Sequence, residues 1–445
     1  MKKIIALILC AVILVALAAC GSLPSSISSL TSQPTPSPTA APSESTEPLA
    51  DDPTPVHDEN VKMWINLDIP SALDEITATA WMIAKAEDHE FTFYMGQSFT
   101  IDEVSNENGI LEWDDGYTID GYYITVPAET GDIISVKYHG GNWDYRSFLK
   151  PETVALIGPA GWHPRKFLFP DDVSDQIRIK VTGLSDYTVV NGEYDGRDGT
   201  WTYYSVKSPS FENYSATLIA FREGTYFTTP DKTVYCLDEA DVEKAVEIHD
   251  YIVDVLKYYN GILYSDYKKE QQNEKVTVIS YSTGEGGMYY EDGLMILHSI
   301  FANINEDDGT KEGMAHEFGH LWANGAAFNW EDWLNETCAN WSARLYLLHS
   351  GQQDVFERII AGDIEKSAGQ PPIKTADGRH PGDTHAKGAV LFYEIYQEYC
   401  GAETIAKLLN IFVSLEEKNT DNFIAEVRVQ VGDEVADYIQ AGLLV

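Results

Sequence analysis

Two histidines and two glutamates in the C-terminal half of the chain have types and spacing that suit a metal centre. His316 and His320 are four residues apart in a segment of helical pattern, so both imidazoles can lie on one helical face and reach one ion. Glu336 follows at the start of another periodic segment and can supply a third ligand. Two histidines and a glutamate, with a fourth position left open, form a known ligand set of catalytic zinc. Glu317 would lie beside the open position, where a carboxylate can take a proton from water.

The sequence between the two histidines and Glu336 predicts how these three residues meet. Gly325 can end the first helix, and residues 328–332 can form the turn that brings the next helix back antiparallel. Asn340 would then lie one helical turn beyond Glu336, where its amide can bond a ligand histidine. The alternative is that these residues have no joint role. The histidines would then lie on the surface of an amphipathic helix, Glu336 would be a solvated glutamate, and Asn340 would be an ordinary surface amide.

The elements that must hold this site differ between the two halves of the chain. Between Glu90 and Phe221, short β-rich runs alternate with turn residues, which predicts a mostly antiparallel sandwich or saddle. These runs are residues 91–94, 122–126, 133–138, 176–181, 201–206 and 214–221. The second half predicts a helix from Asp238 to the stop at Asn260 and Gly261, then strands at 275–281 and 294–298. After Asn305 the pattern is helical nearly to the end.

The first 58 residues do not have the composition of a folded domain. Residues 1–19 have the basic start, apolar run and small-residue end of a signal peptide, and the segment up to Gly21 resembles a lipoprotein box with Cys20 as the lipidated residue. An ordinary signal peptide or an uncleaved membrane anchor is the alternative. Residues 20–58 are rich in Ser, Pro and Thr and predict an extended linker. We expect a β-rich domain at 59–232 and a catalytic domain at 233–445.

Charge and cysteine content narrow the possible partners. The chain has 30 Lys and Arg against 70 Asp and Glu, a net charge of −40. Such an acidic surface is repelled by phosphate backbones and anionic lipid, so no nucleic acid is expected, and membrane contact is expected only through lipid on Cys20. Cys236, Cys338 and Cys400 remain in the folded part without a CxxC pair. One disulfide with a leftover thiol, or three buried thiols, would both fit.

The run Trp333-Leu334-Asn335-Glu336 extends the metal motif into a family resemblance. Together with HExxH at 316–320, it resembles the aminopeptidase N-like family of gluzincin zinc peptidases, although this chain has about three fewer residues between the two motifs than the family usually has. Residues 161–164 and 209–221 resemble segments of the family's N-terminal β-saddle. The resemblance implies an α+β fold, with an antiparallel β-sandwich or saddle before a thermolysin-like, mostly helical zinc peptidase domain.

Two departures from the family pattern concern how substrate is held. Residues 286–290 occupy the place of the family's GAMEN segment, whose glutamate binds a free amine, but Tyr289 stands in that position beside Met288. Glu291 is a candidate replacement two positions later. At residues 385–388 the sequence resembles the family's YEKG segment, with His385 in place of the tyrosine that stabilises the transition state. Thermolysin-like enzymes use a histidine for that task; His298 and His380 are weaker candidates.

These patterns predict a cell-surface enzyme that binds one Zn²⁺ per chain and hydrolyses peptide bonds of a peptide or protein substrate. The metal would lower the pKa of a water molecule, Glu317 would take its proton, and His385 would stabilise the oxyanion. Aminopeptidase and endopeptidase action both remain open. A catalytically silent, lipid-anchored peptide- or solute-binding protein is the alternative, and the presence of Glu317 argues against it because binding needs no general base. A structural surface protein would need no zinc ligands at all.

Overall fold

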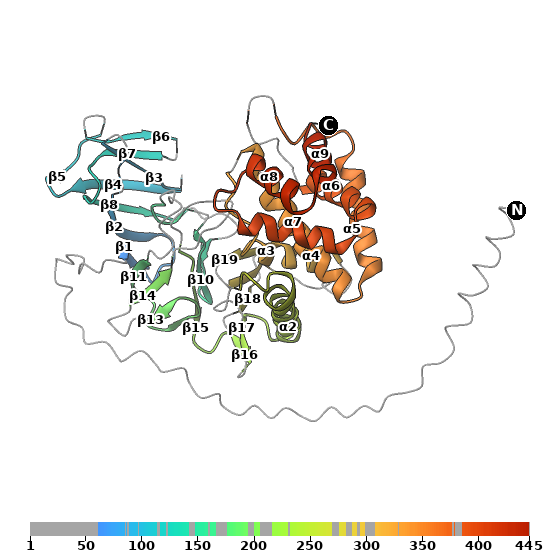
Figure 1. The fold of residues 1–445 in the computed structure, drawn as a ribbon. Helices are drawn as coiled ribbons and strands as arrows, with labels where there is room; N and C mark the ends of the chain where they lie inside the picture. The colour runs from blue at the N-terminus through green and yellow to red at the C-terminus, as the bar shows by residue number, and fades with distance from the viewer. Residues whose placement is uncertain are drawn as a thin grey trace, which may run out of the picture. The chain divides into compact units, whose positions relative to one another are not determined.

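The structure, a computed structural model, describes most of the chain after the linker (Figure 1). The described residues are 61–444, with gaps at 85, 87–88, 97, 114–115, 122, 142–146, 159–160, 166–175, 195–199, 205–215, 230–231, 269–275, 282–286, 292–293, 299–307, 328, 376–377 and 379–384. The predicted signal peptide, Cys20 and the linker fall outside them. Within the described part, no helix combines the length and the apolar character that crossing a membrane requires.

The first half of the described chain is built around an eight-stranded sheet. Its strands, in spatial order, are β13 (Glu193–Tyr194), β14 (Thr200–Tyr204), β11 (Gln176–Thr182), β1 (Val61–Asp68), β2 (Ile76–Ile83), β8 (Ile133–Gly140), β4 (Phe99–Asn106) and β5 (Gly109–Ile110). Neighbouring strands are antiparallel except β1 and β11, which run parallel. In β2 the buried side chains alternate with more exposed ones, so one face of the sheet lies against a core.

Two smaller antiparallel sheets accompany the large one. A four-stranded sheet has the order β12 (Tyr187–Val189), β15 (Leu218–Arg222), β10 (Thr153–Leu156) and β9 (Phe148–Leu149). A three-stranded sheet has the order β3 (Glu90–Tyr94), β7 (Tyr123–Pro127) and β6 (Thr118–Asp120). One hydrophobic cluster joins side chains from all three sheets, including Ile65, Phe93 and Leu218. The three sheets therefore share one core.

Trp162 and His163 lie fully buried in this core region. The indole Nε1 of Trp162 donates to the main-chain oxygen of Ala216 at 2.8 Å. The Nδ1 atom of His163 lies 2.6 Å from the oxygen of Pro164, and the amide of Ala216 donates to Nε2 at 2.9 Å. His163 is thus held as a neutral ring with its proton on Nδ1. Burial lowers its pKa to about 3, against an ordinary value of 6.5.

The second half begins with a five-stranded mixed sheet and a long helix. The sheet has the order β16 (Phe227–Thr229), β17 (Lys232–Cys236), β18 (Thr277–Tyr281), β20 (Leu294–His298) and β19 (Gly287–Glu291). Strands β17, β18 and β20 are parallel, whereas β16 and β19 are antiparallel to their neighbours. The crossover from β17 to β18 contains a 3-10 turn (Glu239–Asp241), α2 (Val242–Tyr258) and a π-helical turn (Tyr259–Leu263). Asp238 begins it by accepting a hydrogen bond from the amide of Ala240.

The rest of the described chain is mostly helical, and a central helix, α4, packs against several of the others. The helices are α3 (Asp308–Gly319), a 3-10 turn (Trp330–Asp332), α4 (Trp333–His349), α5 (Gln353–Ser367), α6 (His385–Glu398), α7 (Ala402–Ser414), α8 (Thr420–Gln430) and α9 (Asp433–Gly442). Every side chain of α4 from Trp333 to Leu347 is buried, so neighbouring helices surround it. Trp322, Trp333 and Trp341 are buried in the common core.

The fold class predicted from the sequence is confirmed: strand-rich sheets come first and a mostly helical region follows. All six predicted strands of the first half overlap observed ones, and the helix predicted after Asp238 is α2. Strand β19 was missed, since its glycine-rich start was interpreted as a turn. The prediction left two states open for the cysteines, and all three are free thiols: Cys236 and Cys338 are buried and Cys400 is exposed. The boundary at 232 stays a prediction.

The buried neutral state of His163 predicts a pH-dependent stability. In the unfolded chain this imidazole takes up a proton below its ordinary pKa of 6.5, whereas the folded chain resists protonation down to about pH 3. The free energy of unfolding should therefore fall, as pH drops through this window, by about 1.4 kcal/mol per pH unit from this group. We expect His163→Gln, which cannot take up a proton, to be less stable at pH 7 and to show a shallower dependence.

Urea unfolding of both proteins at several pH values between 4.5 and 7 checks this prediction. His89→Gln is the control, because the His89 side chain is 82% exposed and the variant should keep the full pH dependence. Identical slopes of the free energy of unfolding against pH in the parent and in His163→Gln would contradict the prediction.

Candidate metal centre

The two histidines of the predicted motif lie where α3 ends. His316 is in the last turn of α3, and His320 follows its last helical residue, Gly319. The amide of His320 donates to the oxygens of both His316 and Glu317, at 3.3 and 3.2 Å, so the chain still turns as a helix there. The two rings are therefore on one face, with centroids 4.7 Å apart.

Glu336 reaches the histidines from the first turn of α4. The Nε2 atoms of His316 and His320 are 3.1 Å apart, and they lie 3.4 and 3.7 Å from Oε2 of Glu336. Two ligand atoms on a tetrahedral zinc, each bonded at roughly 2.0–2.1 Å, are about 3.3 Å apart. Within the described part of the chain, these three residues form the group with ligand atoms close enough for a metal ion. The predicted ligand set is thus brought together at spacings that fit zinc.

The hydrogen bonds of the ligands also fit a metal. Nδ1 of His320 lies 3.1 Å from the oxygen of Ala323 and donates to it, which leaves the lone pair on Nε2. Oε2 of Glu336 is buried and has no well-aligned hydrogen bond. A buried carboxylate oxygen without a donor is costly unless a cation lies against it. The donor set, one oxygen and two imidazole nitrogens, therefore matches a divalent zinc ion in chemistry as well as in spacing.

The electrostatics of this group are those of a cation site. Burial alone would raise the pKa of Glu336, but the neighbouring His316, His320 and His385 lower it to about 2. Burial would lower the pKa of His316, but Glu336, Glu317 and Glu312 raise it to about 9. Burial and the adjacent His316 lower the pKa of His320. The cluster thus favours one positive charge beside Glu336, and a bound metal would take the place of the proton.

Two glycines allow the helices to approach this closely. A Cβ atom on Gly319 would lie 3.1 Å from the oxygen of Ala339 on α4, tighter than most packed side chains. A Cβ atom on Gly388 would lie 1.8 Å from Oγ1 of Thr337, the neighbour of Glu336. A larger residue at Gly388 would require Thr337 to move, and one at Gly319 would require α4 to give by a few tenths of an ångström. Gly319 and Gly388 therefore set how near α3 and α6 come to the ligand-bearing turn of α4.

His385, the first residue of α6, lies at the edge of the ligand cluster. Its Nδ1 atom is 3.0 Å from Oε2 of Glu336, and its ring centroid is 5.5 Å from that of His316. Its side chain is 52% exposed, whereas those of His316 and Glu336 are 9% and 10% exposed. His385 can thus touch both the cluster and a molecule from solvent.

Asn340 lies beside His385, but its hydrogen bond differs from the predicted bond to His316 or His320. Its Nδ2 atom donates to the main-chain oxygen of His385 at 3.5 Å, rather than to the ring of a ligand histidine. The reason is that α6 begins over the face of α4 one turn beyond Glu336. Asn340 therefore contributes to the placement of His385.

Glu317 lies between the two histidines on α3 and is partly exposed. Its charge contributes to the raised pKa of His316, so its carboxylate is near the cluster. Met288, Tyr289 and Glu291 lie on β19, the last strand in the five-stranded sheet, paired with Leu297, Ile296 and Leu294 of β20. The side chains of these three residues and of His298 fall outside the described residues, as does all of His380.

Asn335, predicted only as part of the run Trp333–Glu336, is a buried residue whose side chain holds the turn before Glu336. Its buried side chain accepts a hydrogen bond from the amide of Ala326 and donates to the oxygen of the same residue, at 3.1 and 3.0 Å. Nδ2 also donates to Oδ1 of Asp332 at 2.8 Å. These bonds fix the turn between His320 and Glu336. In the sequence, the feature that could have pointed to this role is the asparagine directly before Glu336, because a buried amide side chain must find hydrogen-bond partners.

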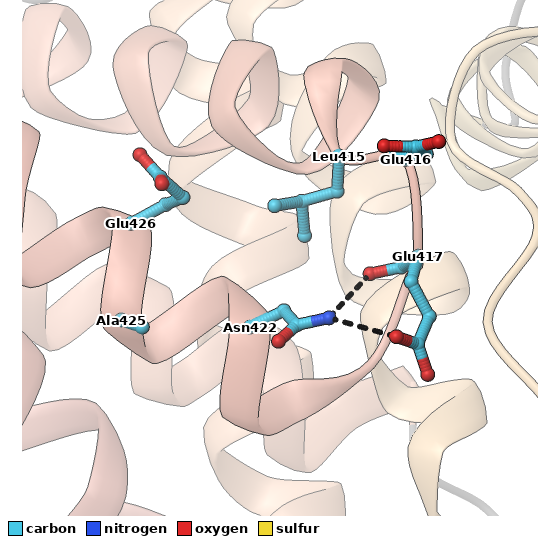
Figure 2. Close-up of a pocket in the computed structure, with 6 residues that line it drawn as sticks. All are labelled: Leu415, Glu416, Glu417, Asn422, Ala425 and Glu426. Atoms are coloured by element: carbon cyan, nitrogen blue, oxygen red, sulfur yellow. Dashed lines mark hydrogen bonds between the residues drawn. The ribbon is translucent and has the colours of Figure 1, made fainter.

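A separate hollow lies at the connection between α7 and α8 and shares no residue with the ligand cluster (Figure 2). It is lined by Leu415, Glu416, Glu417, Asn422, Ala425 and Glu426. The side-chain Nδ2 of Asn422 donates to the main-chain oxygen and to Oε2 of Glu417, at 3.1 and 3.4 Å. The hollow is open and acidic, and its chemistry suggests no catalytic role.

Comparison with known proteins supports the fold. The sequence matches no protein-family model and no curated protein. The structure resembles an M1 zinc metallopeptidase from Deinococcus radiodurans, with a TM-score of 0.56 at 14% identity over 87% of this chain and 93% of that one. It also resembles yeast LTA4 hydrolase, with a TM-score of 0.55 at 12% identity over 86% of this chain and 67% of that one. The chain has the fold of M1 zinc metallopeptidases.

The ligand geometry predicts that zinc stabilises the protein and that Glu336 is needed for this. Zinc at about 100 times its Kd should add about 2.7 kcal/mol to the free energy of unfolding. Glu336→Gln should weaken zinc binding by more than the roughly 10–100-fold that loss of an outer hydrogen-bond partner costs. Thermal unfolding after dialysis against a chelator, with and without added zinc, measures this.

Glu357→Gln is the matched control, because Glu357 is an exposed glutamate on α5 bonded to Gln353. It should keep the full shift of Tm with zinc. A parent protein whose Tm does not respond to zinc would contradict the assignment of the cluster.

Proposed function

We propose that this chain is a zinc metallopeptidase that hydrolyses peptide bonds. The observation that supports it most is the buried Oε2 atom of Glu336, which lies 3.4 and 3.7 Å from two imidazole nitrogens and has no aligned hydrogen bond. Glu317 beside these ligands adds a base that a purely binding or structural protein does not need. The likeness of the fold to M1 zinc metallopeptidases is independent support.

Each residue of the site has a role in this proposal. Nε2 of His316, Nε2 of His320 and the carboxylate of Glu336 hold one zinc ion. When bound, zinc supplies a Lewis acid that polarises a carbonyl and lowers the pKa of water. The carboxylate of Glu317 accepts a proton from the attacking water and returns it to the leaving amine. Its partial exposure places it where substrate and water can reach it.

His385 is proposed to stabilise the negative charge that develops on the substrate oxygen. Its Nδ1 atom lies 3.0 Å from Oε2 of Glu336, and its half-exposed side chain can present a ring nitrogen to substrate. A hydrogen bond to an oxyanion in such a site lowers the barrier by an amount typical of oxyanion-hole donors, about 2.7–4 kcal/mol. Asn340 supports this role because it bonds the main chain of His385.

The substrate class follows from two considerations. A structure of the Deinococcus radiodurans protein, in mutant form, holds the substrate Tyr-Ser-Ala, which makes short peptides the first substrates to try here. Tyr289 occupies the position where the resembled family has its amine-binding glutamate. We therefore propose peptide substrates and leave the preference for free or blocked N-termini to the experiment below.

Glu317→Gln should separate metal binding from turnover. The amide cannot accept a proton, so hydrolysis should fall by about 10²–10⁴-fold. Zinc should still bind at one ion per chain, since Glu317 is not a ligand. Peptide hydrolysis and metal content of the same preparation measure both quantities.

Glu365→Gln, an exposed change on α5, is the control and should behave like the parent protein. Full activity in Glu317→Gln would rule out Glu317 as the base.

A mixed peptide library, half of it N-terminally acetylated, tests the proposed activity itself. Cleavage of acetylated peptides would identify an endopeptidase. Cleavage confined to free N-termini would identify an aminopeptidase, with Glu291 as the next residue to substitute. Zinc binding without cleavage of any peptide would instead favour a lipid-anchored binding protein.

We also propose that the protein is exported and anchored by lipid on Cys20 to the outer face of the cell membrane, as the leader at 1–19 indicates. When an extract of cells that express the full-length protein is separated into detergent and aqueous phases, the protein should enter the detergent phase. Cys20→Ser should move it to the aqueous phase because this change removes the acylated thiol. Cys400→Ser is the control, since Cys400 is an exposed thiol of the folded part. A parent protein found in the aqueous phase would contradict lipidation.

A further inference from the structure

The end of α2 contains an irregular turn that faces the metal-binding helices. Residues Tyr259–Leu263 form a π-helical turn, in which the amide of Tyr264 donates to the oxygen of Tyr259 at 2.7 Å. Such turns are rare and occur often at functional sites. This one places Tyr259 and Tyr264 against Trp322, two residues beyond His320. The Tyr264 ring stacks on the indole at 5.2 Å, and the Tyr259 ring meets it edge-on at 5.6 Å.

The hydroxyl of Tyr259 contacts the helix that bears the histidines. It donates to the main-chain oxygen of Ala315 at 2.8 Å, and Ala315 directly precedes His316. The Tyr259 side chain is fully buried, and burial raises its pKa well above 10, so it stays a donor at any physiological pH. This hydrogen bond therefore fixes the main chain next to the first ligand.

The hydroxyl of Tyr264 is linked to the helix that bears Glu336. It lies 2.6 Å from Oγ of Ser342, which in turn donates to the main-chain oxygen of Cys338 at 2.7 Å. Cys338 is two residues beyond Glu336, and Tyr264 and Ser342 are both fully buried. One short segment thus holds both ligand-bearing helices through hydroxyl groups, with Trp322 packed against both tyrosine rings.

We propose that Tyr259 and Tyr264 are positioning residues for the metal centre, which set the separation of the α3 and α4 ligands through Ala315 and Ser342. The proposal rests on the proposed zinc site but concerns residues that touch neither metal nor substrate. Ligand distances on zinc vary by only about 0.2 Å, so a small shift of one helix weakens the site. Rigid aromatic rings with buried hydroxyls limit such shifts, because each lost hydrogen bond would leave a buried polar group with one partner fewer.

A general contribution of buried tyrosines to stability is the competing explanation, and the chain offers a matched control for it. The hydroxyl of Tyr251, on α2, donates to the main-chain oxygen of Lys311 at 2.8 Å. Lys311 lies on α3 one helical turn before Ala315, away from the ligands. Tyr251→Phe therefore removes the same kind of hydrogen bond from the same helix without touching the ligand turn.

The test compares Tyr259→Phe, Tyr264→Phe and Tyr251→Phe in the full-length protein. Zinc affinity is measured by competition with a chelator, coordination by the visible absorption of bound Co²⁺, and fold stability by the Tm of the metal-free protein. We expect the first two variants to bind zinc about tenfold more weakly, at the lower end of outer-partner effects, and to alter the Co²⁺ spectrum. Tyr251→Phe should lower Tm to a similar degree while leaving zinc affinity and the Co²⁺ spectrum unchanged.

Ser342→Ala provides a smaller change that removes the link to Cys338, and it should weaken zinc binding in the same direction even if a tyrosine variant fails to fold. Equal zinc affinities in the parent, Tyr259→Phe, Tyr264→Phe and Ser342→Ala would overturn the proposal while the zinc site itself stands. A loss of affinity in Tyr251→Phe as large as in the other two variants would also overturn it. A parent protein that binds no zinc would instead show that the proposed function has failed.

Discussion

The burial of one carboxylate oxygen is the constraint on which the arrangement of the helical region depends. Oε2 of Glu336 lies among His316 and His320, at the end of α3, and His385, at the start of α6. A charged oxygen removed from water is stable only with positive charge close by. Gly319 and Gly388 help the rings to approach it, since they let α3 and α6 pack closely on α4. The packing of the helices therefore determines how close the imidazoles come to the Glu336 carboxylate, and with it the electrostatics of the site.

Other buried polar groups near the site connect α4 to the segments around it. Asn335 fixes the turn before Glu336, and Arg344, two helical turns beyond it, is 2% exposed and bonds Asp363 on α5. The guanidinium of Arg344 also lies 3.6 Å from Glu312 on α3. Each of these groups joins α4 to a neighbour. Separating one partner of a buried pair from the other costs folding free energy, so such bonds keep the helices in a single register.

The sequence predicted that His316, His320 and Glu336 lie together, because an i, i+4 spacing puts the histidines on one helical face and the turn after them brings Glu336 back to it. It could not predict Tyr259 or Tyr264, which meet α3 and α4 through contacts between segments far apart in the chain. The same reason explains the role of Asn340: a helix periodicity gives the face of a residue but not which neighbouring helix begins above it. In the first half, alternation predicted strands but not their partners, so the parallel pairing of β1 with β11 had no local signal. Strand β19 was missed because glycines weaken a strand pattern.

That parallel pairing has a consequence for the order in which the protein is assembled. Strand β1 (Val61–Asp68) lies between β2, which follows it closely in the chain, and β11 (Gln176–Thr182), which is synthesised more than a hundred residues later. During synthesis β1 can pair with β2 early, but its other edge stays open until β11 emerges, and closing so long a loop is slow. An open strand edge is a template for wrong pairing with other chains. The vulnerable interval of this protein is therefore the production of residues 69–182, well before the candidate metal-binding residues have been made.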